Sequence, residues 1–102
     1  MAVIMQIMDY ANGQYCHVRG AYIYFVDVQM IPDENWLRVT WHRDKALRFK
    51  DAAEALNVWN TVLESNPIRP DGKPNKPLTA FGMLIEDPDD RPLYVVRPPK
   101  TH

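Results

Sequence analysis

The residues best suited to metal binding or nucleophilic chemistry are one cysteine and three histidines. Cys16 and His17 are neighbours in the chain, so on a strand their side chains would point to opposite faces and could not easily share one ion. A cysteine nucleophile would need His42 beside Cys16 and a third group to orient the imidazole, and the spacing predicts no such arrangement. We therefore predict no metal site, no cofactor and no catalytic residue, and interpret these groups as a buried thiol and a surface imidazole.

A cluster of carboxylates near the C-terminus is the next candidate for chemistry. It comprises Glu86, Asp87, Asp89 and Asp90. The spacing lacks the alternating ligands and the following glutamate of an EF-hand loop, so we expect a solvated turn shaped by its two prolines. Docking of this turn on a basic partner surface stays open. The four glycines of the chain are dispersed and form neither a phosphate-binding loop nor a dinucleotide fingerprint.

Nucleic-acid binding has some support from the basic residues. Cations and one imidazole gather around the predicted hairpin and the helix entry, with two tryptophans among them: Arg38, His42, Arg43, Lys45, Arg48, Lys50, Trp36 and Trp41. Aromatic rings can stack on bases while cations contact phosphates. The competing interpretation, which we favour, places Trp41 in the core and treats the cations as a solvated edge. The formal net charge of -1 also falls short of the basic balance of most such domains, so nucleic-acid binding is our second hypothesis.

Length and composition are those of one soluble globular domain. The chain has 102 residues, 46% of them hydrophobic and 25% charged, which predicts a single domain over residues 1–97 and a disordered tail over residues 98–102. The single cysteine can form no internal disulfide, which is typical of the cytoplasm. Residues 1–8 lack the basic lead and the length of a signal peptide, and no apolar run approaches the roughly 20 residues of a membrane span. We expect a cytoplasmic protein without membrane contact.

The strongest helix signal lies over Asp51–Asn66. Asp51 can accept a hydrogen bond from the first turn, Glu54 occupies the capping-box position three residues later, and Pro67 follows the predicted end. The apolar residues between these ends follow one helical stripe: Ala52, Ala55, Leu56, Trp59, Val62 and Leu63. Because a single amphipathic helix cannot bury its own apolar face, we predict that a sheet covers it.

The remaining apolar segments predict a mostly antiparallel sheet of five or six strands, so the expected fold class is α+β with the helix on one face. The segments expected to be strands are Val3–Met8, Gln14–Val18, Ala21–Val28, Trp36–Trp41, Leu78–Ile85 and Leu93–Arg97. Asn12-Gly13 is a strong turn signal and predicts a hairpin between the first two segments, and we expect the third and fourth to form the central hairpin. Pro67–Pro77 contains four prolines and is expected to be an extended surface loop.

Residues from Trp41 to Ala55 follow the pattern W-x2-D-x-A-x2-F-x-D-x3-A, directly after a tyrosine-rich hairpin. This pattern resembles one found in small hypothetical proteins of bacteriophages and prophages, and the resemblance covers about residues 22–63. It implies a ββαβ unit in which alanines let the helix approach the sheet and Phe49 fills the joint. It also implies a small accessory factor or inhibitor that binds a host protein, an anti-CRISPR-like role included. It carries no catalytic motif.

Aromatic residues exceed what one helix can cover: Tyr22, Tyr24, Phe25, Trp36, Trp41 and Trp59. Strict alternation along the strand would place Phe25 on the face opposite Tyr22 and Tyr24. Tyrosine and tryptophan are enriched at interface hot spots. We therefore predict a non-catalytic protein-interaction module that binds a partner protein or a second copy through Tyr22, Tyr24 and Trp36. Cover of that face by the N-terminal hairpin and the proline loop stays an equal alternative.

Overall fold

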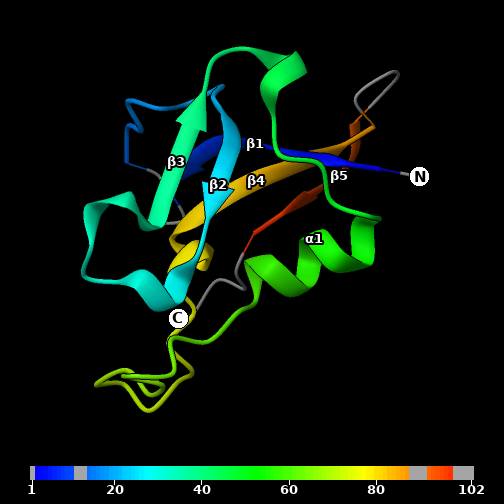
Figure 1. Cartoon of the computed structure of the whole chain (residues 1–102). Helices are drawn as coiled ribbons and strands as arrows, with labels where there is room; N and C mark the ends of the chain where they lie inside the picture. The colour runs from blue at the N-terminus through cyan, green and yellow to red at the C-terminus, as the bar shows by residue number, and fades with distance from the viewer. Residues whose placement is uncertain (1, 11–13, 88–91, 98–102) are drawn as a thin grey trace.

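The computed structural model describes residues 2–10, 14–87 and 92–97 and has an α+β fold (Figure 1). Within these residues one antiparallel sheet contains five strands in the order β3-β2-β1-β4-β5. The strands are β1 (Ile4–Tyr10), β2 (Tyr22–Val26), β3 (Leu37–Thr40), β4 (Phe81–Glu86) and β5 (Pro92–Val96). A single α-helix, α1 (Ala52–Trp59), packs on one face of the sheet. The predicted fold class is confirmed.

Short 3-10 helices join several of these elements: η1 (Val28–Met30), η2 (Glu34–Trp36), η3 (Arg43–Lys45) and η4 (Pro77–Ala80). Because η4 occupies the start of the segment predicted as a strand over Leu78–Ile85, β4 begins at Phe81. The proline loop is exposed, as predicted, but it folds back on itself, since the Arg69 amide donates to the Lys73 carbonyl (2.8 Å). No helix in the described ranges has the length and apolar character that a membrane span requires.

β1 is the central strand, and the predicted pairing of the first two segments is wrong. β1 pairs with β4 on one side and with β2 on the other, whereas Gln14–Val18 forms no strand and buries little besides Cys16. The Asn12-Gly13 turn lies outside the described residues. Three residues of β1 are almost fully buried: Ile4, Met5 and Ile7. A strand that is apolar on both faces needs a neighbouring strand on each side and cover on each face, so it takes partners that are distant in sequence.

α1 begins where the sequence predicts and ends earlier. The Asp51 carboxylate accepts a hydrogen bond from the Glu54 amide (2.9 Å), which is the expected N-cap contact. The helix stops before Asn60, well short of the predicted end at Asn66. The side chains of Asn60 and Thr61 each donate to a carbonyl of the last turn (3.0 and 2.9 Å). Short polar side chains of this kind compete with the helical backbone pattern, which explains why the predicted length is wrong.

The two faces of the sheet differ, and we call the face under α1 the inner face. Its core contains Met5 and Ile7 of β1, Ile23 of β2, Met83 and Ile85 of β4, and Ala55 and Trp59 of α1. The Trp59 indole N–H donates to the Phe81 carbonyl (3.1 Å), so the polar edge of the ring has a partner. Side chains alternate along a strand, so Ile4 and Gln6 of β1 project to the opposite, outer face.

The linker from β3 to α1 enters the sheet between β2 and β1. The structure describes one registered residue pair between these two strands. Beyond that pair, the Leu47 amide donates to the Ile23 carbonyl of β2 (2.8 Å), and Phe49 exchanges two hydrogen bonds with Val3 (2.9 and 2.8 Å). Phe49 is buried, as predicted for the residue that fills the joint. The linker therefore holds the two sides of the sheet together where β2 leaves β1.

Candidate functional site

A β-bulge in β2 shapes the outer face of the β2–β3 hairpin. Ile23 is buried and lies opposite Val39, but the register then shifts and Phe25 lies opposite Arg38. Paired residues share a face, so Phe25 and Arg38 project outward together. Tyr24 is the extra residue of the bulge, and the Arg38 guanidinium carbon lies 5.8 Å from the centre of its ring. Tyr24 is 49% exposed and Phe25 39%. Strict alternation, which would have separated these two rings, is wrong here.

Trp41 follows β3 directly and is 61% exposed. The prediction that it belongs to the core is therefore wrong. One ring carbon lies 3.8 Å from the position that a Cβ atom would take on Gly20, so the indole lies against the backbone of this glycine. Gly20 has a φ of +91°, a conformation that favours glycine. We call Tyr24, Phe25, Arg38 and Trp41 the outer hairpin surface.

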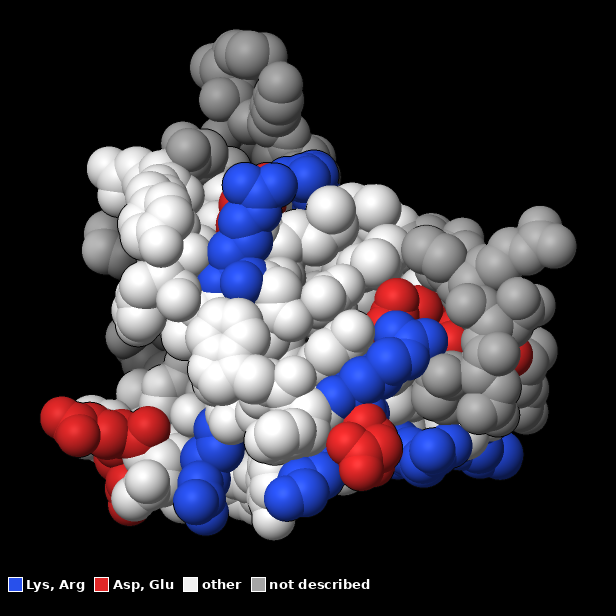
Figure 2. All heavy atoms as spheres, turned by 90° about the horizontal axis from the view of Figure 1, so that it is seen from above, with Lys and Arg blue, Asp and Glu red and all other residues white. Residues whose placement is uncertain are grey.

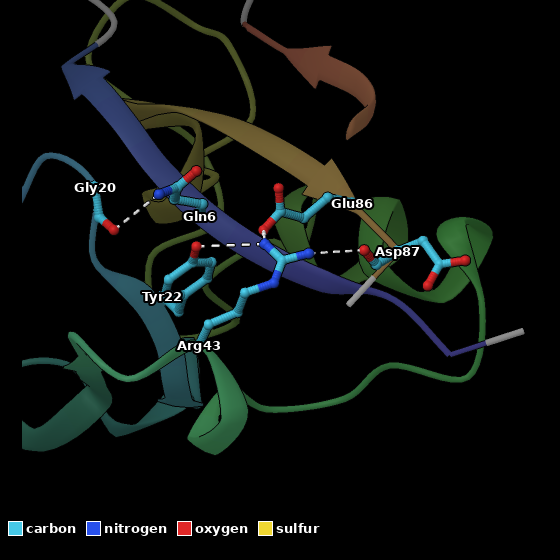
Figure 3. A network of polar contacts seen from close by, with 6 residues as sticks. All are labelled: Gln6, Gly20, Tyr22, Arg43, Glu86 and Asp87. Atoms are coloured by element: carbon cyan, nitrogen blue, oxygen red, sulfur yellow. Dashed lines mark hydrogen bonds and ion pairs between the residues drawn. The ribbon is translucent and has the colours of Figure 1, made fainter. Parts of the chain in front are cut away.

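Arg43 of η3 reaches over the outer face and joins two strands that are not neighbours (Figure 3). Its Nη1 donates to the Tyr22 hydroxyl of β2 (3.4 Å) and forms an ion pair with Glu86 of β4. Its Nη2 donates to the Asp87 carbonyl (2.9 Å). The hydrogen bond to Tyr22 raises the pKa of Arg43, and the charge of Glu86 raises it further against the opposing effect of burial. The guanidinium is thus held in its charged form.

This network crosses the central strand. Gln6 of β1 lies opposite Tyr22 on one side, and Ile4 lies opposite Glu86 on the other. Arg43 must therefore pass over β1 to connect β2 with β4, and Ile4 is buried on this face. The Gln6 side-chain amide donates to the carbonyl of Gly20 (2.9 Å), the same glycine that supports the Trp41 ring. Gly20 thus contacts Gln6 of the central strand (Figure 3) and also Trp41 of the outer hairpin surface.

Glu86, the first residue of the acidic cluster, is not part of a solvated turn. Glu86 belongs to β4, and its side chain is 5% exposed because it is paired with Arg43. Asp89 and Asp90 lie outside the described residues. In the described part of the chain, no three histidine, cysteine, aspartate or glutamate side chains gather as ligands for a metal ion. Cys16 is buried, whereas His17 and His42 are exposed.

A second arginine–carboxylate pair lies at the other end of the outer face. Arg97, which follows β5, donates from Nη1 to both oxygens of Asp9 in β1 (2.7 and 2.8 Å). Gly82 of β4 lies opposite Asp9. A Cβ atom on Gly82 would lie 2.5 Å from Asp9 Oδ1, so the missing side chain makes room for the ion pair. No local sequence pattern predicts this site, because Asp9, Gly82 and Arg97 are distant in the chain and meet only in the folded sheet.

The structure separates the three residues predicted to form the interaction surface. Tyr24 is exposed, Tyr22 is half-buried and bonded to Arg43, and Trp36 is half-buried against the core. Phe25 and Trp41 take the exposed positions instead. The β2 segment contains no glycine or proline that would have marked the bulge.

The residues predicted to bind nucleic acid are also divided. Arg38, His42, Lys45 and Arg48 are exposed, whereas Arg43 is engaged with Glu86. Figure 2 shows an uncharged area in the middle of one face, with Lys and Arg side chains along its lower border and acidic side chains among them. The basic side chains therefore form an interrupted row.

Comparisons with family models, with curated proteins and with solved structures give no match. The geometry of the outer hairpin surface is thus the basis for assigning a function. This surface combines exposed aromatic rings with the Arg38 guanidinium group beside the edge strand β3.

Proposed function

We propose that this protein is a non-catalytic protein-interaction module that binds a partner protein through the outer hairpin surface. The observation that supports the proposal most is the β-bulge, which turns Tyr24 and Phe25 outward beside Arg38. In a regular strand one of these two rings would lie in the core. Tyrosine, tryptophan and arginine are the residues most enriched at binding hot spots, and all three types occur on this surface.

Contacts within the protein hold the backbone under the outer hairpin surface in place. Binding of a partner therefore costs less conformational entropy. Arg43 connects β2 with β4 through Tyr22 and Glu86, so the linker after β3 is anchored over the sheet. Trp41 rests against Gly20. A partner would therefore meet aromatic groups whose backbone positions are already set.

The resemblance of residues 22–63 to phage and prophage proteins directs the search for a partner to a bacterial host. We propose an accessory or inhibitory role toward a host protein, and a second copy of the chain is the simplest competing partner. Light scattering at several protein concentrations separates the two, because self-association raises the measured mass without any added protein.

The test of this function uses three proteins: wild type, the double variant Tyr24→Ser/Phe25→Ser, and a control, Ile68→Ser. Ile68 is an exposed apolar residue of the proline loop and is not part of the outer hairpin surface. Affinity capture from host lysate, followed by quantitative mass spectrometry, should recover a protein with wild type and with the control that the double variant loses. Equal recovery of every captured protein by all three, with equal masses in solution, would contradict the proposal.

Nucleic-acid binding is the second candidate, and the exposure of Trp41 favours it. An exposed indole can stack on a base, and Lys45 and Arg48 lie exposed on the same linker. A mobility-shift assay with single-stranded DNA at increasing salt tests this function. Binding that weakens steeply with salt and is lost in Trp41→Ala would support it. The absence of any shift at low salt would reject it.

A further inference from the structure

β3 is the last strand on its side of the sheet in the part of the chain that the structure describes. Alternate residues of an antiparallel edge strand direct their N–H and C=O groups away from the sheet, where another chain can pair with them. The two faces of this edge differ in chemistry. Leu37 and Val39 pack against the inner core but are half-buried, whereas Arg38 projects outward and is exposed. The core is therefore incompletely covered along this edge.

We propose that the partner contributes an extended segment in which acidic and apolar residues alternate, and that this segment pairs with β3 as a sixth strand. The inference rests on the proposed function and names the chemistry of the partner. Apolar side chains of the segment would extend the core beside Leu37 and Val39. Acidic side chains would project to the outer face beside Arg38. Residues two apart on a strand share a face and lie about 7 Å apart, so one segment can satisfy both faces.

The exposed linker cations Lys45, Arg48 and Lys50 lie on the side of β2 away from the free edge, because their linker enters the sheet between β2 and β1. The positive charge at the edge itself comes from Arg38, which is exposed and favours an acidic side chain beside it. Charge complementarity of this kind speeds encounter and fixes the register of the added strand. The rings beside Arg38 then provide apolar contact area next to the ion pairs.

A polypeptide fits this edge better than a nucleic acid. A sugar–phosphate backbone could meet the outer cations, but it has no N–H and C=O ladder to pair with the edge strand. It would also leave Leu37 and Val39 half-exposed. The exposed acids Asp33 and Glu34, just before β3, would repel any anionic chain that extended past Leu37, so the paired acidic segment must end at β3.

The first experiment titrates labelled full-length protein with a capped synthetic peptide, Gly-Glu-Val-Glu-Val-Glu-Gly, and follows backbone amide resonances. β3 has four residues, so pairing spans only about 13 Å and binding is expected to be weak. The amides of Leu37–Thr40 should shift most and exchange more slowly with solvent. A peptide with lysine in place of each glutamate should bind at least about tenfold more weakly. A peptide with proline at the central glutamate should also weaken, because it loses an N–H donor.

The second experiment reverses the charge on the protein. Arg38→Glu should lose the preference for the acidic peptide and gain one for the lysine peptide, whereas Lys73→Glu, in the exposed proline loop, should behave as wild type. Amide spectra of the free variants establish that both are folded. An Arg38→Glu protein that still prefers the acidic peptide would overturn the inference. So would shifts that map away from β3, or equal binding of both charge versions.

A thymidine decamer, titrated in parallel, separates the remaining outcomes. Binding of the oligonucleotide without binding of the acidic peptide would overturn the inference and favour the nucleic-acid function. If neither ligand binds, strand addition by an acidic segment is rejected. In that case the proposed function is tested separately by affinity capture. It is supported if Tyr24→Ser/Phe25→Ser loses a captured protein that Ile68→Ser retains, and it is contradicted if both variants retain it.

Discussion

The inner and outer faces of the sheet are built from the same five strands but are stabilised differently. The inner face is closed by α1 and by apolar side chains that exclude water, such as Ile7 and Met83. Among the described residues, the outer face is held by arginine–carboxylate pairs at Glu86 and at Asp9. The inner face can thus supply most of the free energy of folding, while the outer face leaves aromatic side chains open to a partner.

The largest effect is expected on the inner face. Ile7→Ala would remove buried apolar contacts and leave a cavity, so the free energy of unfolding should fall by about 2–5 kcal/mol. Val95→Ala, at an exposed position of β5, serves as the matched control and should change it by less than about 1 kcal/mol. Denaturant unfolding of both variants measures the difference. Equal losses would contradict the division of roles between the faces.

The Arg43–Glu86 pair should give the next largest effect. Arg43→Met leaves the buried Glu86 carboxylate without its charged partner, which should cost about 2–3 kcal/mol of unfolding free energy. This lies below the usual range for a buried pair, because the Arg43 side chain is 37% exposed and partly screened. The double variant Arg43→Met/Glu86→Leu should recover most of the loss in the same denaturant assay. Additive losses in the double variant would show that the pair does not act as a unit.

The difference in unfolding free energy between wild type and Arg43→Met depends on pH in a way that follows from the raised pKa of Arg43. A group whose pKa is raised on folding contributes stability that is present below its unfolded pKa and is lost as the pH rises through the folded value. For arginine that window is strongly alkaline. The free-energy difference between wild type and Arg43→Met should therefore stay constant over neutral and mildly alkaline pH, and a decline there would contradict the assignment.

Gly82→Ala should have a smaller effect, of about 1 kcal/mol. The added methyl group would displace the Asp9 carboxylate from the position in which it accepts from Arg97. Thermal unfolding measures the loss. In an Asp9→Ala background the substitution at Gly82 should cost much less, because the carboxylate is already absent. An unchanged cost in that background would place the clash at the Arg97 side chain, whose Nη1 lies 3.1 Å from the position of the added Cβ atom.

The smallest effect on folding is expected where the effect on binding is largest. Phe25→Ser removes an exposed ring and should change the unfolding free energy by no more than about 0.5–1 kcal/mol. The same variant should weaken capture of the partner. A loss of stability as large as that of Ile7→Ala would show that the Phe25 ring belongs to the core and would remove the basis of the proposed surface.

The sequence predicts local features of the fold correctly and distant contacts poorly. Asp51 and Glu54 mark the start of α1 because the cap contact lies within one turn. The end of α1 was missed because Asn60 and Thr61 donate to the carbonyls of the last turn, and competing local bonds outweigh the apolar stripe. The alternating apolar pattern predicts strands, but it does not say which strands pair. The predicted partner of β1, Gln14–Val18, is therefore wrong, and β1 pairs with β2 and β4.

The candidate site shows the same limit. The abundance of aromatic residues predicts a binding surface on the hairpin, and Tyr24 is exposed as expected. A one-residue bulge decides that Phe25 is exposed too, and no residue type in β2 signals it. The burial of Glu86 depends on Arg43, which is distant in sequence and meets it only through the folded sheet. The acidic residues around Glu86 in the sequence, taken alone, therefore suggest a solvated turn.

The entry of the linker limits the pairing of β2 with β1 to one end of these strands, so the β2–β3 hairpin has fewer direct contacts with β1 than β4 has. Leu47 and Phe49 of the linker form backbone hydrogen bonds with Ile23 and Val3, one on each side of this boundary between β2 and β1. On the outer face, the Arg43 side chain crosses the same boundary and contacts both Tyr22 and Glu86. Local opening of the molecule is therefore expected to start at this boundary between β2 and β1. Such opening would break the contacts of Arg43 with Tyr22 and Glu86 and so release the backbone that positions the exposed aromatic rings.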